Sequence, residues 1–242
     1  LYNDYYLGDL ETGRLTRDQA GNLLKCFMIT FFAKTQGKLF GKPFLCGPDA
    51  NELSYLIFEA YRDMHIEDPK FHVRLSDRTP TRFLERVVRC IQDGCTSIVL
   101  VNNDGQVDML TRNGKAREDA EDYILIGCYE PAVQGKELNC SGAAILNLAK
   151  AVEQALDDGD HATFEALKDA YLKHLDSSFT ALADRVRRWE KLWPEVSPTP
   201  LLSGSMASCV QTGRDISKAG ADYNPSGCCC IGLADATDSL AV

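Results

Sequence analysis

A cysteine and a carboxylate lie two positions apart where an apolar run ends. Residues 123–126 are apolar and stop at Gly127, which is followed by Cys128 and then by Glu130 in front of a proline. Glycine lets the backbone turn and lets other groups approach closely, and proline biases the preceding residue away from helix. If residues 128–130 are extended, the thiol and the carboxylate lie on one side, with α-carbons about 6.6 Å apart. Both groups can then face one bound substrate.

The residues around this corner do not favour ordinary thiolate catalysis. A cysteine nucleophile needs a base or a cation that lowers the pKa of its thiol, and no histidine is close to Cys128 in the sequence. All histidines fall in helical or strand patterns, and we interpret each as a surface or packed residue: His65, His72, His161 and His174. A structural interpretation therefore stays open, with Cys128 as a core thiol and Glu130 as a loop cap.

The elements that would position the corner alternate between strand and helix patterns. The predicted strands cover residues 44–46, 71–75, 97–101 and 123–126, and the predicted helices cover residues 1–10, 16–36, 49–61, 79–91 and 116–122. Alternation of this kind implies parallel strands joined by right-handed crossovers. Cys128 would then follow the carboxyl end of a parallel strand, where α/β folds concentrate their sites. We expect a turn at residues 102–105 and a helix cap at Asp49.

The pattern beyond the corner is mostly helical. We predict helices at residues 143–156, 161–193 and 205–211, an apolar segment at 228–233 and a further helix from Asp235. Prolines within residues 197–200 end the long helix. We see no internal repeat and no low-complexity linker, so we expect one domain over residues 1–242.

The overall composition excludes several classes of partner. The formal net charge of the 242 residues is −9, which argues against nucleic acid or an anionic membrane surface. No apolar run approaches the roughly 18 residues that a membrane span needs. We therefore expect neither nucleic acid nor a membrane as partner.

The chain has ten cysteines without the pattern of a disulfide framework or a zinc site. Cys228, Cys229 and Cys230 are adjacent, and neighbouring residues rarely form a disulfide because the bond geometry is specific. No C-x-x-C pair occurs, so we expect no metal site. Reduced thiols favour a cytoplasmic location, and their abundance suits an anaerobic or strongly reducing cell.

The sequence G-C-Y-E-P-A-V-Q-G-K-E at residues 127–137 resembles the active-site loop of the glycyl radical enzymes, whose usual form is G-C-x-E-P followed by a G-K pair. The similarity covers nearly the whole chain in order. Further similar segments are residues 13–16, 49–56, 73–80, 118–120, 220–227 and 234–240. The cysteine loop is the most specific of them.

This resemblance implies a fold and a reaction. The fold is a helix-rich α/β fold, here an incomplete part of the ten-stranded α/β barrel of the pyruvate formate-lyase-like family. Cys128 would become a thiyl radical that abstracts hydrogen from substrate, which requires no lowered pKa. Glu130 matches the general base of the dehydratase, lyase and decarboxylase branches.

Two other functions remain open. One is a formate C-acetyltransferase-like acyltransferase, which the resemblance disfavours because that branch has two adjacent cysteines where this chain has Cys128 followed by Tyr129. The other is a non-catalytic relic or binding fragment that lacks the radical domain.

The resemblance also suggests residues of a substrate pocket. Gly142 stands where glycerol-type dehydratases have an aspartate, which argues against a vicinal diol. We take Ser141, Asn139, Cys46 and Asn103 as substrate-binding candidates. For Ser141, capping of the helix predicted to follow is an equal alternative. Of the three adjacent cysteines near the C-terminal end, we expect at most alternate ones to point inward.

The resemblance implies a radical that is stored outside this chain. The family stores it on a glycine in an R-V-x-G-Y/F motif, which does not occur in these 242 residues. We therefore expect the central part of a longer enzyme, inactive alone and homodimeric in its full-length form. A radical S-adenosylmethionine, iron–sulfur activating enzyme would install the radical through the missing domain.

Overall fold

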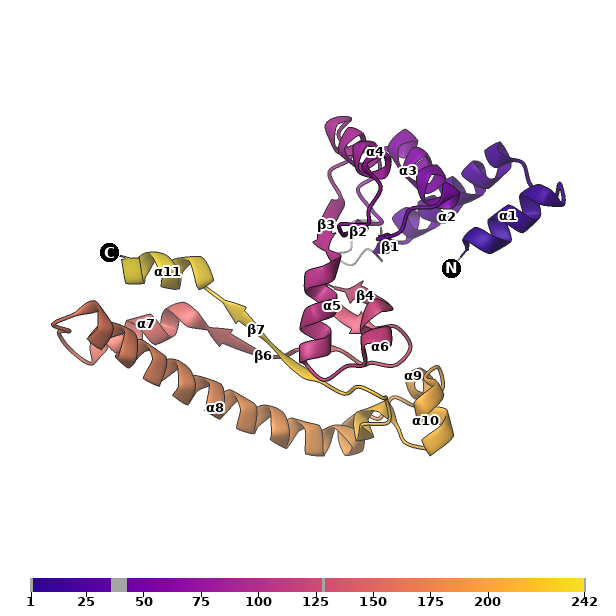
Figure 1. Ribbon diagram of the computed structural model, residues 1–242. Coiled ribbons are helices and arrows are strands. Elements are labelled where there is room, and N and C mark those ends of the chain that lie inside the picture. The colour runs from indigo at the N-terminus through magenta and orange to yellow at the C-terminus, as the bar shows by residue number, and fades with distance from the viewer. Residues whose placement is uncertain (1, 36–42, 128, 242) are drawn as a thin grey trace. The chain divides into compact units, whose positions relative to one another are not determined.

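The computed structural model describes residues 2–35, 43–127 and 129–241, so Cys128 lies outside the described residues (Figure 1). The chain divides into two compact units, unit 1 (Leu1–Pro131) and unit 2 (Ala132–Val242). Each unit is described by itself below. The single domain expected over residues 1–242 stays a prediction.

Unit 1 contains a small parallel sheet and its connecting helices. Its elements are α1 (Asn3–Glu11), α2 (Arg17–Thr35), β1 (Phe44–Cys46), α3 (Glu52–Met64), β2 (Phe71–Leu75), α4 (Thr81–Gln92), β3 (Ile98–Asn102), α5 (Asn103–Arg112), α6 (Arg117–Glu121) and β4 (Tyr123–Ile126). β5 (Glu130–Val133) begins at the end of this unit. The strand order β1-β2-β3 is parallel throughout, as the alternation of strands and helices predicted.

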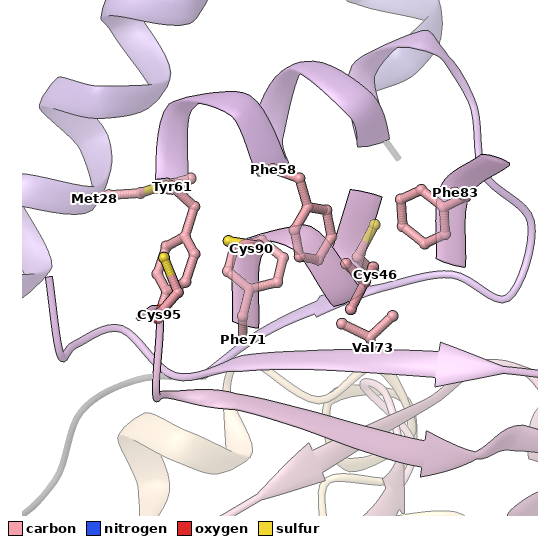
Figure 2. Close-up of a cluster of buried hydrophobic side chains, with 10 residues drawn as sticks. Met28, Cys46, Phe58, Tyr61, Phe71, Val73, Phe83, Cys90 and Cys95 are labelled. Atoms are coloured by element: carbon pink, nitrogen blue, oxygen red, sulfur yellow. The ribbon is translucent and has the colours of Figure 1, made fainter. Parts of the chain in front are cut away.

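One face of this sheet packs against helices. Phe71 in β2 pairs in register with Phe44 in β1 and Ile98 in β3. Figure 2 shows Phe58 and Tyr61 of the overlying helix α3 projecting toward Phe71 and Val73. Buried side chains from α2, α4, the loop after α4 and β1 complete this apolar core: Met28, Phe83, Val87, Cys90, Cys95 and Cys46. We call this side of the sheet the helix face.

The other face of the sheet packs against α5, α6 and β4. Its apolar members form a second cluster made of Val101, Val107, Leu110, Ala120, Tyr123 and Leu125, with Leu45 and Val99 packed against it. Side chains alternate across a strand, so His72 and Arg74 of β2 point to this side, away from Phe71 and Val73. We call it the hairpin face, because β4 belongs to the hairpin that contains position 128.

Three local predictions in unit 1 are wrong. The cap of α3 is Asn51, whose side chain and that of Ser54 form a reciprocal capping box, whereas Asp49 was predicted. The expected turn at residues 102–105 is the start of α5, capped by Asn102 through a 3.0 Å hydrogen bond from the Gly105 N–H. β4 pairs with β5 in a separate two-stranded sheet and is not a strand of the parallel sheet. Local side-chain hydrogen bonds and a tight turn override the spacing pattern at these points.

Unit 2 contains one strand pair and a long helix. Its elements are β6 (Cys140–Asn147), α7 (Leu148–Asp157), α8 (Phe164–Val196), α9 (Pro200–Ser203), α10 (Ala207–Thr212), the 3₁₀ helix η1 (Ile216–Lys218), β7 (Ser226–Ile231) and α11 (Leu233–Ala241). β6 and β7 are parallel, and Leu146 of β6 packs with side chains of α7, α8 and α11. In β7, half-buried Cys229 lies between exposed Cys228 and Cys230, so the three thiols alternate.

The predicted helix over residues 143–156 is only partly right. Residues up to Asn147 belong to β6, and the helix begins at Leu148. Pairing with β7 decides this and overrides the helix propensity of Ala143 and Ala144. The Asn147 side chain accepts a hydrogen bond of 3.2 Å from the Lys150 N–H and so caps α7.

Candidate active site

The candidate site is the turn that joins β4 to β5. The Tyr129 N–H donates a hydrogen bond of 3.0 Å to the Ile126 carbonyl, which closes a four-residue turn around position 128. Gly127 has φ +52° and Tyr129 has φ +86°. The expectation that residues 128–130 are extended is therefore wrong, since Tyr129 occupies the left-handed region. A bulky residue there is held by its surroundings.

The Glu130 carboxylate folds back over this turn. A side chain placed on Gly127 would put its β-carbon 3.1 Å from Glu130 Oε2. That space, together with the positive φ of Gly127, requires glycine at this position. The carboxylate therefore lies against Gly127, the residue immediately before Cys128. The turn brings it there, whereas the sequence analysis considered an extended strand. The placement of Cys128 itself lies outside the described residues.

A buried arginine supports the base of the hairpin on the sheet. Arg74 Nε donates a hydrogen bond of 2.8 Å to Asn103 Oδ1, and a terminal nitrogen of Arg74 donates one of 2.8 Å to the Glu121 carbonyl. Its guanidinium lies 4.3 Å from the centroid of the Tyr123 ring, at the start of β4. Burial lowers the pKa of Arg74, while the nearby Tyr123 and Asp122 oppose that shift. An arginine stays charged here, so this contact is a cation on an aromatic face.

Asn103, a predicted substrate-binding residue, belongs to the same network. It is buried, its carbonyl accepts from Arg74, and its amide nitrogen donates to Asp104 at 3.0 Å. Both ends of the amide are thus engaged within the protein. A contact between Asn103 and substrate stays a prediction.

Cys46, another predicted substrate-binding residue, lies on the helix face. It packs in the apolar core with Phe58 and Val73. Burial raises the pKa of its thiol, and a hydrogen bond with Ser54 opposes that shift. The structure therefore does not bring Cys46 to the face that carries Asn103, and its contact with substrate stays a prediction.

The remaining two candidates belong to unit 2. Asn139 is half-buried and directly precedes β6. Ser141 lies within β6, but its side chain is outside the described residues. The alternative role of Ser141 as a helix cap is wrong, because Asn147 caps α7.

Sequence analysis missed two residues that lie beside the turn. His72 is fully buried, and the centroid of its ring lies 5.3 Å from that of Tyr129 in an edge-to-face contact. Lys70 Nζ lies 5.6 Å from the same Tyr129 centroid. The available signal was the alternation in residues 70–74, which puts Lys70, His72 and Arg74 on one side of the strand. His72 was interpreted as a surface or packed residue, and its contact with Tyr129 depends on a chain reversal more than fifty residues away.

Metal-ligand clusters and membrane spans are both absent from the described residues. Among them, no group of three or more His, Cys, Asp or Glu side chains could hold a metal ion. None of the helices in the described part of the chain is long and apolar enough to cross a membrane.

Comparison with protein families identifies one match. The model of the family described as "Pyruvate formate lyase-like" matches residues 47–242. The matched segment contains β2, β3, the β4–β5 hairpin and all of unit 2, and it begins after α1, α2 and β1.

Two curated relatives catalyse eliminations according to their names. The chain is 26% identical over 274 aligned positions to trans-4-hydroxy-L-proline dehydratase of Clostridioides difficile, covering 98% of this chain and 35% of that protein. It is 28% identical over 211 positions to isethionate sulfite-lyase of Desulfovibrio desulfuricans, covering 79% of this chain and 24% of that protein. The chain thus spans between about a quarter and about a third of the length of these relatives.

A solved structure has the same fold over nearly all of the chain. It is the crystal structure of a glycyl radical enzyme from Archaeoglobus fulgidus, with a TM-score of 0.86 and 27% identity, covering 98% of this chain and 35% of that one. This likeness confirms the predicted fold class, a helix-rich α/β part of a barrel of that type.

Proposed function

Because the chain belongs to the pyruvate formate lyase-like family of glycyl radical enzymes, we propose that its turn at residues 126–130 carries out a radical elimination. Cys128 abstracts a hydrogen atom from a small-molecule substrate, and Glu130 is the general base. The reaction class is that of a dehydratase, a C–S or C–N lyase or a decarboxylase. The dehydratase and sulfite-lyase among the relatives support an elimination.

One observation carries the proposal. Glu130 Oε2 would lie 3.1 Å from a β-carbon on Gly127, so the carboxylate is folded over the turn that contains position 128. A carboxylate held there can reach a substrate that also touches residue 128, because Glu130 directly follows the four-residue turn that contains position 128. The hairpin is anchored on the sheet through Tyr123, which limits how far that turn can move.

The proposed step balances in atoms and electrons. The sulfur radical of Cys128 takes a hydrogen atom from a substrate carbon, giving a thiol and a carbon radical. Glu130 accepts a proton from the substrate while the leaving group departs with its electron pair, and that proton ends on the leaving group. The Cys128 thiol then returns its hydrogen atom to the product radical. The chain's residues supply position and exclude water.

The source of the radical and the partners follow from the family. A glycine-centred radical supplies the unpaired electron, and an activating enzyme that uses S-adenosylmethionine and an iron–sulfur cluster generates it. A homodimeric full-length protein in the cytoplasm belongs to the same proposal. Asn103, Asn139, Ser141 and Cys46 remain the proposed contacts with substrate.

Substitution of Cys128 tests the proposal in the full-length protein. We expect Cys128→Ala and Cys128→Ser to abolish turnover while the paramagnetic signal of the glycyl radical remains. Cys26→Ala, at an exposed cysteine of unit 1, is the matched control and should keep normal turnover. Retained turnover in either Cys128 variant would contradict the assignment of Cys128.

Glu130→Gln tests the general base separately. We expect substrate to bind with little change in affinity and elimination to stop, because the amide cannot accept the proton. Glu118→Gln, at an exposed carboxylate of α6, serves as the control. A normal elimination rate in Glu130→Gln would refute the role of Glu130 and leave that of Cys128 standing.

A further inference from the structure

The first arm of the hairpin and its turn both contact side chains along one strand. Lys70, His72 and Arg74 lie at alternate positions along and just before β2. Arg74 lies under the ring of Tyr123, where β4 begins, and the other two lie beside the ring of Tyr129, where the turn ends. The turn is therefore supported from the sheet on both sides of position 128.

His72 makes its contact through the ring and not through hydrogen bonds. Its side chain is fully buried, and within the described residues neither ring nitrogen has a hydrogen-bond partner. Burial, and then the positive charge of Lys70, lower the pKa of His72, so the ring is neutral. Unpaired buried nitrogens destabilise the fold. The favourable contribution of His72 is therefore the packing of its ring.

Tyr129 is the residue through which such a contact would act. It adopts φ +86°, a conformation that a bulky side chain keeps only when its surroundings impose it. Its neighbours in the chain are Cys128 and Glu130, so a change in its backbone moves both groups. Its own ring is partly exposed and meets His72 at an interplanar angle of 67°.

We propose that His72 is a positioning residue for the cysteine turn: its buried ring packs against the ring of Tyr129 and thereby fixes the positions of Cys128 and Glu130 relative to the substrate. This inference rests on the proposed function of the turn. The imidazole takes part in no chemical step. The shape of its ring, and not its nitrogens, is required to position the turn.

The test compares His72→Ala with His72→Phe in the full-length protein. Alanine removes the support, and we expect kcat per glycyl radical to fall about 10- to 100-fold, the effect of a misplacement of up to about 1 Å. KM should change little, because His72 touches no substrate. Phenylalanine keeps the edge contact without the unpaired nitrogens, so we expect normal kcat and a melting temperature that is equal or higher. Normal kcat in His72→Ala, or a kcat in His72→Phe as low as in His72→Ala, would overturn the proposal.

A double-mutant cycle tests whether the effect passes through Tyr129. If it does, the double variant His72→Ala/Tyr129→Ala loses no more activity than the more damaging single variant. Losses that multiply independently would overturn the proposal. His65→Asn, at an exposed left-handed position that asparagine tolerates, is the control for removing an imidazole from unit 1.

Hydrogen exchange separates failure of this inference from failure of the proposed function. The Tyr129 N–H is bonded to the Ile126 carbonyl, so its exchange rate reports on the turn without any turnover. We expect faster exchange in His72→Ala and the rate of the unsubstituted protein in His72→Phe. If the unsubstituted full-length protein is inactive and the two variants show this exchange pattern, the proposed function is refuted, whereas the support of Tyr129 by His72 is not. Unchanged exchange in His72→Ala refutes the support by His72 whatever the activity.

Discussion

The helix face and the hairpin face of the sheet in unit 1 use alternate residues of the same strand for different tasks. Phe71 and Val73 point into an apolar core that also contains buried side chains of α2, α3 and α4. His72 and Arg74 point the other way and meet two tyrosines of the hairpin. The helix face holds unit 1 together, whereas the hairpin face positions a turn. Because side chains alternate along a strand, one set of β2 residues stabilises the core and the other set positions the turn.

The largest effect on stability is expected on the helix face. Phe71→Ala should lower the free energy of unfolding of unit 1 by about 3–5 kcal/mol, because a fully buried ring leaves a cavity. Hydrogen exchange of the β1–β3 amides measures this best, since both tryptophans of the chain, Trp189 and Trp193, lie in unit 2. Leu84→Ala, at a partly exposed position of α4, should cost less than about 1 kcal/mol. Equal effects of the two substitutions would contradict the role of Phe71 as a core residue of the helix face.

A smaller effect is expected from the cation of the hairpin face. Arg74→Met should cost about 2–3 kcal/mol, because Asn103 Oδ1 and the Glu121 carbonyl lose a charged donor. Amide exchange at the start of β4 should rise with it. Arg74→Lys should not restore stability, since one ammonium cannot reproduce the planar fork. Arg112→Met, at an exposed position of α5, is the control, and an equal change there would contradict the role of Arg74.

Cys46 tests which face binds substrate. Cys46→Ser should destabilise unit 1 by about 1–2 kcal/mol, because it buries a more polar group in an apolar core. Cys46→Ala should raise KM of the full-length protein if Cys46 contacts substrate as proposed, and an unchanged KM would limit substrate binding to the hairpin face, because the Cys46 side chain lies on the helix face. A clear rise in KM would support the predicted contact of Cys46 with substrate and break the separation between the faces.

The smallest effect is a pH dependence that comes from His72. Its pKa is lowered in the folded state by burial, so the unfolded chain binds more protons than the folded chain as pH falls below about 6.5. The stability that neutral His72 contributes is fully present above that pH and is lost as pH falls toward the folded pKa. Subtracting the curve of His72→Phe from that of the unsubstituted protein should isolate this loss. Identical curves would show that His72 titrates normally.

Much of the fold followed from sequence patterns. The strands at residues 71–75 and 123–126, the long helix ended near residues 197–200 and the parallel pairing of β1–β3 are confirmed, because long periodic segments report which side is buried. The errors fall where a few local bonds decide, as at Asn51 and Asn102. The start of α7 was missed because a partner strand more than eighty residues away extends β6 to Asn147.

The sequence by itself determined the reactive group types and their order: glycine, cysteine and, two residues on, a carboxylate before proline. It also determined the family to which the chain belongs. Only the tertiary structure decided that a turn, not an extended strand, brings Glu130 back over Gly127. It also decided that His72 and Lys70 lie beside Tyr129 and that Cys46 does not share their face. Such contacts join residues far apart in the chain, and local spacing carries no information about which distant side chains a reversal brings together.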